Sequence, residues 1–327
     1  MKLLLIMPNF FDYPEQISQE LNKMGYEVDF YDDRPSTNTL IKAAVRINKN
    51  IIRTYIKKYF SKILNETSSK EYDIVLVISG QSLSFDENMI KDLKESQKKA
   101  KFVLYQWDSQ KNFPYIIRMQ KYFDKCYTFD RRDSRENDKL IFLPLFYSDR
   151  YKEIGQNRND KCKYDFCFVG TAHPKKYKFI KIMSEQLKSI YQKQFVYFYL
   201  PSKLVYIYRK IKNKEFKDAN ISEFNFKPLS SKEMNELYVD SKCVLDSPQD
   251  NQVGLTIRVI ETLGAKKKLI TTNKDVVNYD FFNESNIYIY DGDFDFTSEF
   301  FNSEYIELPK KIYEKYSLKK WLETLLK

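Results

Sequence analysis

The chain has 327 residues, of which 43% are hydrophobic and 16% aromatic, so it can bury a core and is not a disordered chain. Its 55 basic and 45 acidic residues give a net charge of +10, which favours anionic partners without choosing among nucleic acid, lipid headgroups and phosphorylated substrates. No Gly-X-Y period and no apolar run of about 18 residues occurs, which excludes a collagen-like chain and a membrane-spanning helix.

Strand and helix patterns alternate through the first 150 residues, starting with an apolar strand that lacks the cleavage site of a signal peptide. Strands are predicted at residues 2–8, 27–32, 73–79, 101–107, 125–129 and 140–147. Helices are predicted at residues 13–24, which end at Gly25, 39–64 and 86–97. This alternation is typical of a parallel sheet with helical crossovers.

The alternation restarts after a polar stretch at residues 147–163, which we interpret as a linker. Strands are predicted at 164–169, 195–200, 223–229, 243–246, 268–272 and 286–290. Helices are predicted at 175–191, 231–239 and 255–263, with two short helices in 308–326. We therefore predict an α/β protein whose two Rossmann-like domains, 1–150 and 151–308, face a ligand-binding cleft, with the helices of 309–327 packing back on the first domain.

The motifs of several common enzyme classes are missing. The sequence has no GxGxxG, Walker A, GxSxG or HExxH motif, which argues against the usual dinucleotide, NTPase, hydrolase and zinc-protease sites. Its four cysteines are scattered, and its one histidine, His173, cannot complete a usual zinc set with them. Reduced cytosolic thiols are the better interpretation.

The best signal is the segment QVGLTIRVIETLG at 252–264, where a loop enters a helix at Gly254. A glycine there lets backbone amides approach a phosphate, and the helix dipole favours the anion. Arg258 can add a charge-assisted contact to phosphate, and Glu261 can accept hydrogen bonds from ribose hydroxyls. An ordinary crossover helix with a surface Arg–Glu pair explains the spacing equally well.

A second signal is the turn FVGTAHPKK at 168–176, where a strand ends at Gly170 before a helix. Thr171 and His173 lie where ligands bind outside the strand ends of a Rossmann unit. Lys175 and Lys176 oppose the helix dipole unless an anion is present. The alternative is a capped turn with solvated lysines.

The order of FVGT and HPKK, FNFKPLSSKEMNELYVDSKCVLD and GLTIRVIETLGAKKKLITTN resembles the donor half of GT-B glycosyltransferases, above all the CgeB-like and bacterial capsule or lipopolysaccharide enzymes. The segments PNFFDYPEQISQELNKMGYEVDFYDDRP, YQWDS and FDRRDS resemble their acceptor half, so the resemblance covers nearly the whole chain. It implies a GT-B fold and a nucleotide-sugar donor, which is a substrate rather than a cofactor.

The motifs and the resemblance together give these donor-site residues: Gly170, Thr171, His173, Lys227, Pro228, Leu229, Gly254, Leu255, Thr256, Arg258 and Glu261. The resemblance implies that 254–256 meet the diphosphate, that Glu261 binds ribose, that 227–229 lie near the nucleobase and that 170–171 form a turn at the cleft. One departure is Val253, which stands where the related E-x7-E pattern has a glutamate. The donor sugar and a retaining mechanism therefore stay open.

Two carboxylates of the acceptor half are candidate catalytic residues, because an inverting transfer needs a base on the acceptor hydroxyl. Asp12 follows the first strand and Asp108 follows the fourth, and we prefer Asp108. Its alternative role is the N-cap of the next helix. Arg34 and Trp107 are the candidate acceptor contacts, and a solvated loop arginine is the plain alternative for Arg34.

The motif Asp291-Gly292-Asp293 looks like a metal-binding DxD, but its position after the last strand favours a turn at Gly292. We therefore predict no metal site, and expect the diphosphate to be stabilised by helix amides and Arg258.

Two basic stretches, 42–62 and 203–217, mix lysine and arginine with apolar residues, as do amphipathic helices that bind an anionic leaflet. The alternative for the first stretch is a helix that packs on the sheet and keeps a solvated basic face. We favour membrane association, because a lipid-linked acceptor would explain both stretches.

The sequence thus predicts a cytoplasmic glycosyltransferase, peripheral at the inner face of the plasma membrane, that acts on a surface glycan or a lipid-linked acceptor. The surface glycan would be a capsule, lipopolysaccharide or exopolysaccharide. A basic nucleic-acid-binding protein is one alternative, although no RRM, KH or helix-turn-helix signature supports it. A non-catalytic GT-B-like scaffold is the other, and Val253 keeps it open.

Overall fold

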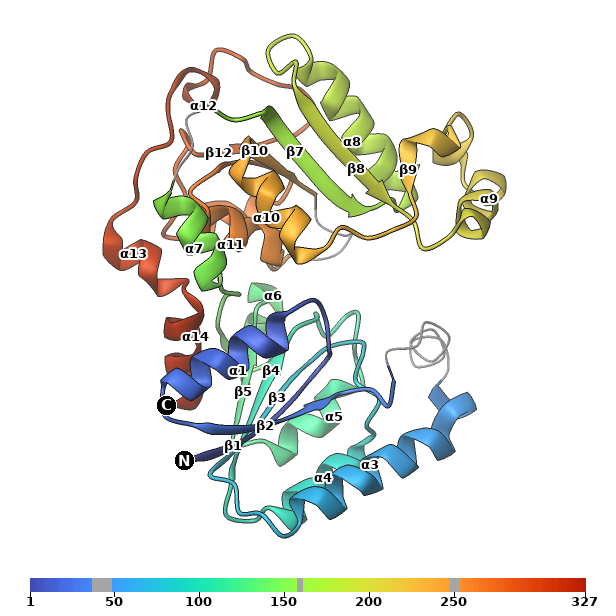
Figure 1. The fold of residues 1–327 in the computed structure, drawn as a ribbon, viewed down its shortest axis with the longest axis vertical. Helices are drawn as coiled ribbons and strands as arrows, with labels where there is room; N and C mark the ends of the chain where they lie inside the picture. Colours follow the sequence, from blue (N-terminus) through green and yellow to red (C-terminus); the bar gives the residue numbers. More distant parts are fainter. Residues whose placement is uncertain (37–48, 158–160, 248–252) are drawn as a thin grey trace. The chain divides into compact units, whose positions relative to one another are not determined.

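The computed structural model describes residues 1–36, 49–157, 161–247 and 253–327, which form two compact units (Figure 1). Unit 1 consists of Met1–Leu145 and Leu318–Lys327, and unit 2 of Phe146–Ser317. Each unit contains a six-stranded sheet in which every pair of neighbouring strands is parallel. The predicted α/β class is confirmed.

The sheet of unit 1 has the strand order β2-β1-β3-β4-β5-β6. Its strands are β1 (Lys2–Met7), β2 (Glu27–Asp32), β3 (Ile74–Ser79), β4 (Lys101–Gln106), β5 (Lys125–Thr128) and β6 (Leu140–Phe142). Its helices are α1 (Tyr13–Lys23), α3 (Arg53–Thr67), α4 (Glu87–Ser96), α5 (Ile116–Met119), α6 (Arg131–Glu136) and α14 (Leu318–Leu326), with 3-10 turns η1 (Lys49–Ile52) and η2 (Gln120–Tyr122).

Helices cover both faces of this sheet, which is why its central strands are almost entirely buried and mostly apolar. Buried side chains of α3, α4 and α5 pack on one face. On the other face Trp321 of α14 lies against the Tyr105 ring, with the ring centroids 4.7 Å apart, and α14 lies beside α1 (Figure 1). The last helix of the chain is therefore part of the first unit.

The sheet of unit 2 has the strand order β12-β11-β10-β7-β8-β9. Its strands are β7 (Tyr164–Thr171), β8 (Gln194–Tyr199), β9 (Phe224–Asn225), β10 (Ser241–Asp246), β11 (Lys268–Thr271) and β12 (Ile287–Ile289). Its helices are α7 (Asp149–Gln156), α8 (Pro174–Leu187), α9 (Lys203–Lys212), α10 (Ser231–Val239), α11 (Ile257–Gly264), α12 (Glu299–Asn302) and α13 (Lys310–Lys315), with 3-10 turns η3 (Lys214–Phe216), η4 (Ile221–Glu223) and η5 (Lys274–Asn278).

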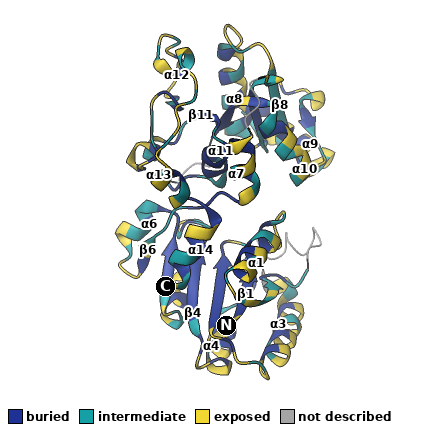
Figure 2. Cartoon of the chain, turned by 60° about the vertical axis from the view of Figure 1, so that its left-hand side comes forward, coloured by how far each residue is buried: buried dark blue, intermediate teal, exposed yellow. Residues whose placement is uncertain are grey.

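Aromatic rings fill the core of unit 2 on the α8 face. The ring of Tyr177 lies 5.0 Å from Phe198, 4.9 Å from Phe216 and 5.1 Å from Phe224, measured between ring centroids. Helices α7, α10 and α11 lie together on the other face. Figure 2 shows that the strands carry buried residues while exposed residues lie on the outer faces of the helices.

The linker interpretation of residues 147–163 is wrong, because this stretch contains α7, which packs within unit 2. Tyr151 and Ile154 of α7 are buried, and a Cβ atom on Gly155 would lie 2.5 Å from the carbonyl oxygen of Gly264. The glycine therefore permits a close helix contact rather than a flexible chain. A short amphipathic helix with a polar outer face has the composition of a loop, which is why composition misled the prediction.

Other elements follow the sequence with shifted ends. Helix α1 ends before Gly25, which has the left-handed φ of +90° predicted by a glycine at a helix C-terminus. The strand predicted at 223–229 is restricted to β9, and the rest is a loop. Residues 37–48, which include Lys42 and Arg46 of the first basic stretch, lie outside the described residues.

Candidate functional site

The residues singled out in the sequence gather at the carboxyl edges of the two parallel sheets, where α/β proteins bind ligands. In unit 1, Asp12 follows β1, Arg34 follows β2, and Trp107 and Asp108 follow β4. In unit 2, the positions are 170–173 at the end of β7, 227–229 after β9 and 254–261 at and beyond the end of β10. Each edge forms its own set of contacts.

The start of α11 is fixed by polar contacts from β10 and from the segment after β11. Thr256, the residue before the helix, donates its hydroxyl to Oδ1 of the buried Asp246 at 2.9 Å and does not cap the helix amides. Asn273 donates its side-chain amide to the carbonyls of Val253 at 3.0 Å and Gly254 at 3.4 Å. The helix start therefore keeps the partial positive charge that attracts an anion.

Arg258 joins the two segments that the sequence identified separately. Its guanidinium group donates to the carbonyl of Val169 in β7 and lies 6.0 Å from the centroid of the Phe168 ring. Burial alone would lower the pKa of Arg258, but the neighbouring Tyr238, Asp246 and Glu261 raise it. Arg258 is thus a permanent positive charge that holds the start of α11 against the end of β7.

Glu261 lies on the inner side of α11 and is only 7% exposed. Its carboxylate accepts from the hydroxyl of Tyr151 in α7, and burial together with the charge of Glu261 raises the pKa of that tyrosine. Tyr151 is a site residue that the sequence analysis missed, because it lies in the stretch interpreted as a linker. The ribose role of Glu261 stays a prediction.

Two cations, Arg209 and Lys176, and the imidazole of His173 surround the first turn of α8, which contains no acidic residue. His173 precedes the helix with an exposed side chain, and its pKa is lowered by partial desolvation and by the charges of Arg209 and Lys176. Arg209 reaches this turn from α9 and donates to the carbonyl of Ala172. A turn that gathers positive charge at a helix start favours an anionic ligand.

The glycine at the end of β7 has a packing role beside these cations. A Cβ atom on Gly170 would lie 2.8 Å from the ring of Phe168, the ring that Arg258 approaches. Thr171 is the last residue of β7, so the strand is two residues longer than predicted. The loop at 227–229 is held by Tyr197, which donates its hydroxyl to the carbonyl of Lys227 at 2.7 Å.

The carboxyl edge of unit 1 contains a buried acid that the sequence analysis missed, Asp33. Its Oδ2 accepts hydrogen bonds from Ser79 at 2.6 Å and Ser82 at 2.7 Å. Burial raises the pKa of Asp33 to about 7, against the lowering effect of the two hydroxyls and Arg34. The adjacent Asp-Asp-Arg letters were visible in the sequence, but only the fold brings the two serines to them.

Arg34 is 5% exposed and is held by its neighbours. Its Nε lies 3.3 Å from a carboxylate oxygen of Asp32 and 3.4 Å from one of Asp33. A second nitrogen donates to the carbonyl of Asn9 at 3.4 Å. The interpretation as a solvated loop arginine is therefore wrong, and contact with an acceptor stays a prediction.

Asp108 organises the turn after β4 and is half-buried. One carboxylate oxygen accepts from the side chain of Asn112 at 3.2 Å, and the other accepts from the amide of Gln81 at 3.4 Å. The N-cap alternative is wrong, because the next helix, α5, has Tyr115 at that position. Both hydrogen bonds hold the Asp108 carboxylate in place after β4.

Asp12 lines an open pocket of about 270 Å³ beside the start of α1. Glu15 contributes a second carboxylate to the pocket, and Phe11 and Phe30 contribute exposed rings. Carboxylates can accept hydrogen bonds from sugar hydroxyls, and aromatic rings can cover the apolar face of a sugar. Trp107 instead packs edge-on against Tyr13, with the ring centroids 5.6 Å apart.

The Asp291-Gly292-Asp293 segment forms a turn, with Gly292 at a φ of +142°. Asp293 accepts from the backbone amide of Phe294 at 2.9 Å. In the part of the chain that the structure describes, no three His, Cys, Asp or Glu side chains form a group that could hold a metal ion. None of the described helices is both long and apolar enough to cross a membrane.

Comparison with solved structures supports the predicted fold. HepE from Anabaena, solved with UDP-glucose, is 8% identical with a TM-score of 0.57, and the match covers 100% of this chain and 98% of that chain. An alpha-glucosyltransferase solved with UDP and a mismatched 13-mer DNA is 14% identical with a TM-score of 0.54, covering 88% and 81% of the two chains. The predicted GT-B fold is confirmed.

The same fold also includes an enzyme of another class. UDP-GlcNAc 2-epimerase from Neisseria meningitidis, solved with UDP-GlcNAc, is 14% identical with a TM-score of 0.51, covering 100% of this chain and 99% of that chain. No protein-family model and no curated protein sequence matches the chain. At such identities the comparisons establish the fold, and the activity rests on the site.

Proposed function

We propose that the chain is a glycosyltransferase that takes a sugar from a UDP-sugar bound at the carboxyl edge of unit 2. One observation carries this proposal: the uncapped start of α11 is joined by Arg258 to the end of β7, where a diphosphate would meet helix amides and fixed positive charge. The choice of uridine is supported by the UDP ligands of the structural neighbours.

In this proposal the residues of unit 2 stabilise the leaving group. Negative charge develops on the diphosphate as the glycosidic bond breaks, and preorganised donors that already point at it lower the barrier. The amides at 254–256, Arg258 and the cations around His173 would perform this task. Because these groups can stabilise the leaving diphosphate, we infer transfer that does not need a metal ion.

Unit 1 would bind the acceptor. Asp108 is our preferred base for an inverting transfer, and Asp12 in its pocket is the second candidate. We infer a glycan or lipid-linked acceptor, because the Asp12 pocket combines carboxylates with aromatic rings and because the chain is basic. A cytoplasmic enzyme at the inner face of the plasma membrane, acting in polysaccharide biosynthesis, fits that acceptor.

Nucleotide binding is the first test. UDP at about 100 times its Kd should stabilise the folded chain by about 2.7 kcal/mol and raise its melting temperature, with GDP and TDP as matched comparisons. Arg258→Gln should remove the rise while the variant still melts cooperatively. If UDP, GDP and TDP all leave the melting temperature unchanged, the proposed assignment of the donor site is wrong.

The fate of the bound donor separates the remaining alternatives. UDP release that requires the acceptor and leaves the sugar bonded to it supports transfer, whereas a changed sugar that is not bonded to the acceptor indicates epimerisation. UDP binding without turnover indicates a non-catalytic scaffold. Salt-dependent oligonucleotide binding together with indifference to UDP would instead favour the nucleic-acid-binding alternative.

A further inference from the structure

Helix α9 presents an unusually exposed apolar surface. Leu204 is 77% exposed, Ile207 50%, Tyr208 63% and Ile211 75%. These four residues, which we name the α9 ridge, have the i, i+3, i+4, i+7 spacing that places side chains on one face of a helix. Figure 1 shows α9 at the outer edge of unit 2, beyond β9.

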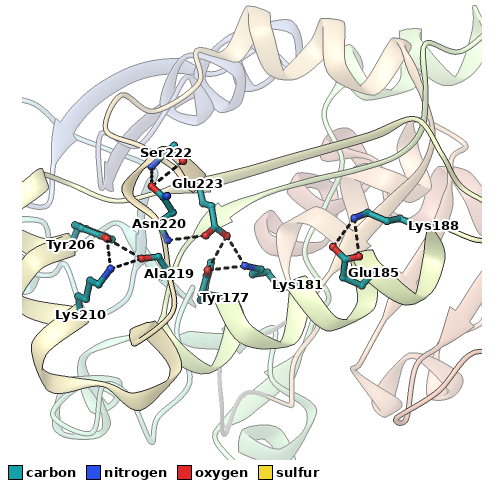
Figure 3. A network of polar contacts seen from close by, with 10 residues as sticks. All are labelled: Tyr177, Lys181, Glu185, Lys188, Tyr206, Lys210, Ala219, Asn220, Ser222 and Glu223. Carbon is teal, nitrogen blue, oxygen red and sulfur yellow. Dashed lines mark hydrogen bonds and ion pairs between the residues drawn. The ribbon is translucent and has the colours of Figure 1, made fainter.

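The opposite face of α9 is firmly held by unit 2. Tyr206 is buried against Phe224 and donates its hydroxyl to the carbonyl of Ala219 at 2.9 Å. Lys210 donates to the same carbonyl at 2.8 Å (Figure 3). Ser202 caps the helix by accepting from the amide of Val205. The α9 ridge is therefore displayed by an ordered helix, not by a frayed one.

The loop that receives α9 is itself tied to α8. Glu223 accepts from the hydroxyl of Tyr177 and pairs with Lys181, with both contacts at 2.8 Å (Figure 3). Asn220 and Glu223 also form a capping box around η4. This network fixes the position of the Ala219 carbonyl on which α9 rests.

Basic residues flank the ridge, and α9 contains no acidic residue. At about 100° per residue, the ridge spans about 100° of the helix surface, and Lys203 and Lys212 lie about 40° beyond its two borders. Both lysines are exposed. An apolar stripe bordered by lysines complements an anionic membrane surface, whose acyl region takes the stripe and whose headgroups pair with the ammonium groups.

We propose that the α9 ridge is a membrane-docking surface that inserts into the interface of an anionic leaflet. Helix α9 has 10 residues and a length of about 15 Å, so it lies in the plane of the interface. Tyr208 suits the headgroup level, because its ring is apolar and its hydroxyl is polar. The proposal goes beyond the donor site and does not depend on it.

In the described part of the first basic stretch, the apolar face of α3 is buried, while Ile51 and Tyr55 are exposed near its start. Ile56, Phe60 and Ile63 of α3 are at most 3% exposed and belong to the core of unit 1. Lys57 and Lys58 are exposed on the outer face. Helix α3 therefore packs its apolar face on the sheet and keeps exposed lysines, and membrane association of this stretch stays a prediction.

Flotation of the full chain with phosphatidylcholine vesicles, with and without phosphatidylglycerol, tests the proposal. The wild-type chain should bind the anionic vesicles, and high salt should weaken that binding. Leu204→Ser with Ile211→Ser should weaken it by at least about tenfold, because two aliphatic side chains no longer leave water. Lys203→Gln with Lys212→Gln should weaken binding to the anionic vesicles in particular.

Two controls keep the result interpretable. Ile182 and Ile190 of the same unit are 44% and 41% exposed, so Ile182→Ser with Ile190→Ser removes exposed aliphatic side chains at another place and should leave binding unchanged. All variants should keep the wild-type melting temperature. Failure of the wild-type chain to bind anionic vesicles, or equal binding by the ridge variant, would overturn the proposal. A ridge-dependent dimer without vesicle binding would instead assign the ridge to a second copy of the chain.

Discussion

Both sheets are parallel throughout and differ in strand order, and their carboxyl edges carry opposite chemistry. In unit 1 the strand ends hold carboxylates, Asp33 and Asp108, that accept hydrogen bonds from hydroxyls and amides. In unit 2 they gather the cations Arg209 and Arg258 beside the imidazole of His173. The difference shows that two parallel sheets can present opposite charge at their carboxyl edges, and that the side chains decide which.

The buried carboxylates of unit 2 stabilise the positive charge of Arg258. Asp246 and Glu261 both raise the pKa of Arg258, and Asp246 also holds Thr256 before α11. In unit 1 the cation stabilises the carboxylates instead, because Arg34 lies beside Asp32 and Asp33. Substitutions at the two edges should therefore affect separate steps, donor binding at one and acceptor activation at the other.

The largest expected effect is on the reaction rate. Asp108→Asn should lower the transfer rate by about 10² to 10⁴ if this carboxylate is the base, while the Kd for UDP stays at the wild-type value. Asparagine retains the shape and can still accept from Gln81, so the fold should survive. Steady-state rates and UDP titration of the same samples measure the two quantities.

Asp12→Asn is the matched comparison for that experiment. If the rate falls in Asp12→Asn and not in Asp108→Asn, the base lies in the pocket beside α1. A loss of UDP binding in either variant would contradict the separation of the two edges.

Arg258→Ala should have the next largest effect, and on both stability and donor binding. Removal of the guanidinium group leaves Asp246 and Glu261, both under 10% exposed, without their shared cation, which should cost about 3 kcal/mol of unfolding free energy. UDP binding should also be lost. Urea denaturation and UDP titration provide the measurements, and an unchanged unfolding free energy would show that Arg258 is not the hub of this edge.

Gly80→Ala should disturb the unit 1 edge by about 2 kcal/mol. The added Cβ atom would lie 2.8 Å from the Cβ of Asp108, so the turn after β4 has to shift. Transfer should weaken while UDP affinity is retained, because the donor edge is untouched. Thermal unfolding with and without UDP checks both statements, and a variant that loses UDP binding at wild-type stability would refute them.

The α/β fold could be predicted from the sequence, because hydrophobic strand patterns and glycines at the ends of helices and strands are local signals. It also located Gly254 and Arg258 on the correct side of a strand–helix junction. Tyr151 and Arg209 could not be predicted, because both reach the carboxyl edge of unit 2 from elements distant in the sequence. A contact made through tertiary packing leaves no spacing pattern to read.

The same reason explains why Asp33 and its partners at the carboxyl edge of unit 1 were not predicted. Ser79 and Ser82 lie almost 50 residues after Asp33, and only the parallel pairing of β1 with β2 and β3 brings them together. Arg34 was therefore predicted as a site residue from its charge, whereas the buried Asp33 beside it was not. Burial, which raises the pKa of Asp33, is a property of the fold and not of the letters.

Asp33→Asn should change how stability depends on pH. The folded state keeps the proton on Asp33 up to about pH 7, whereas the ordinary pKa is 3.8, so this group makes the chain less stable as pH rises between those values. The variant has no titrating group at position 33. Its unfolding free energy, relative to that of the wild type, should therefore rise as pH increases from 3.8 to about 7. Denaturation at a series of pH values measures the difference, and parallel curves would contradict the assignment.

The smallest expected effect is at His173, and it concerns the opposite edge. Its pKa is lowered by partial desolvation and by Arg209 and Lys176, so the ring is neutral at neutral pH in the empty site. A bound diphosphate would offset those charges, and acidification would then add a cation beside it, strengthening UDP binding by about two- to fivefold. His173→Gln removes the titration, and the phosphate of UDP titrates identically in both proteins. The Kd of His173→Gln for UDP, divided by that of the wild type, should therefore rise as pH falls below about 6.5. A constant ratio would place His173 outside the donor site.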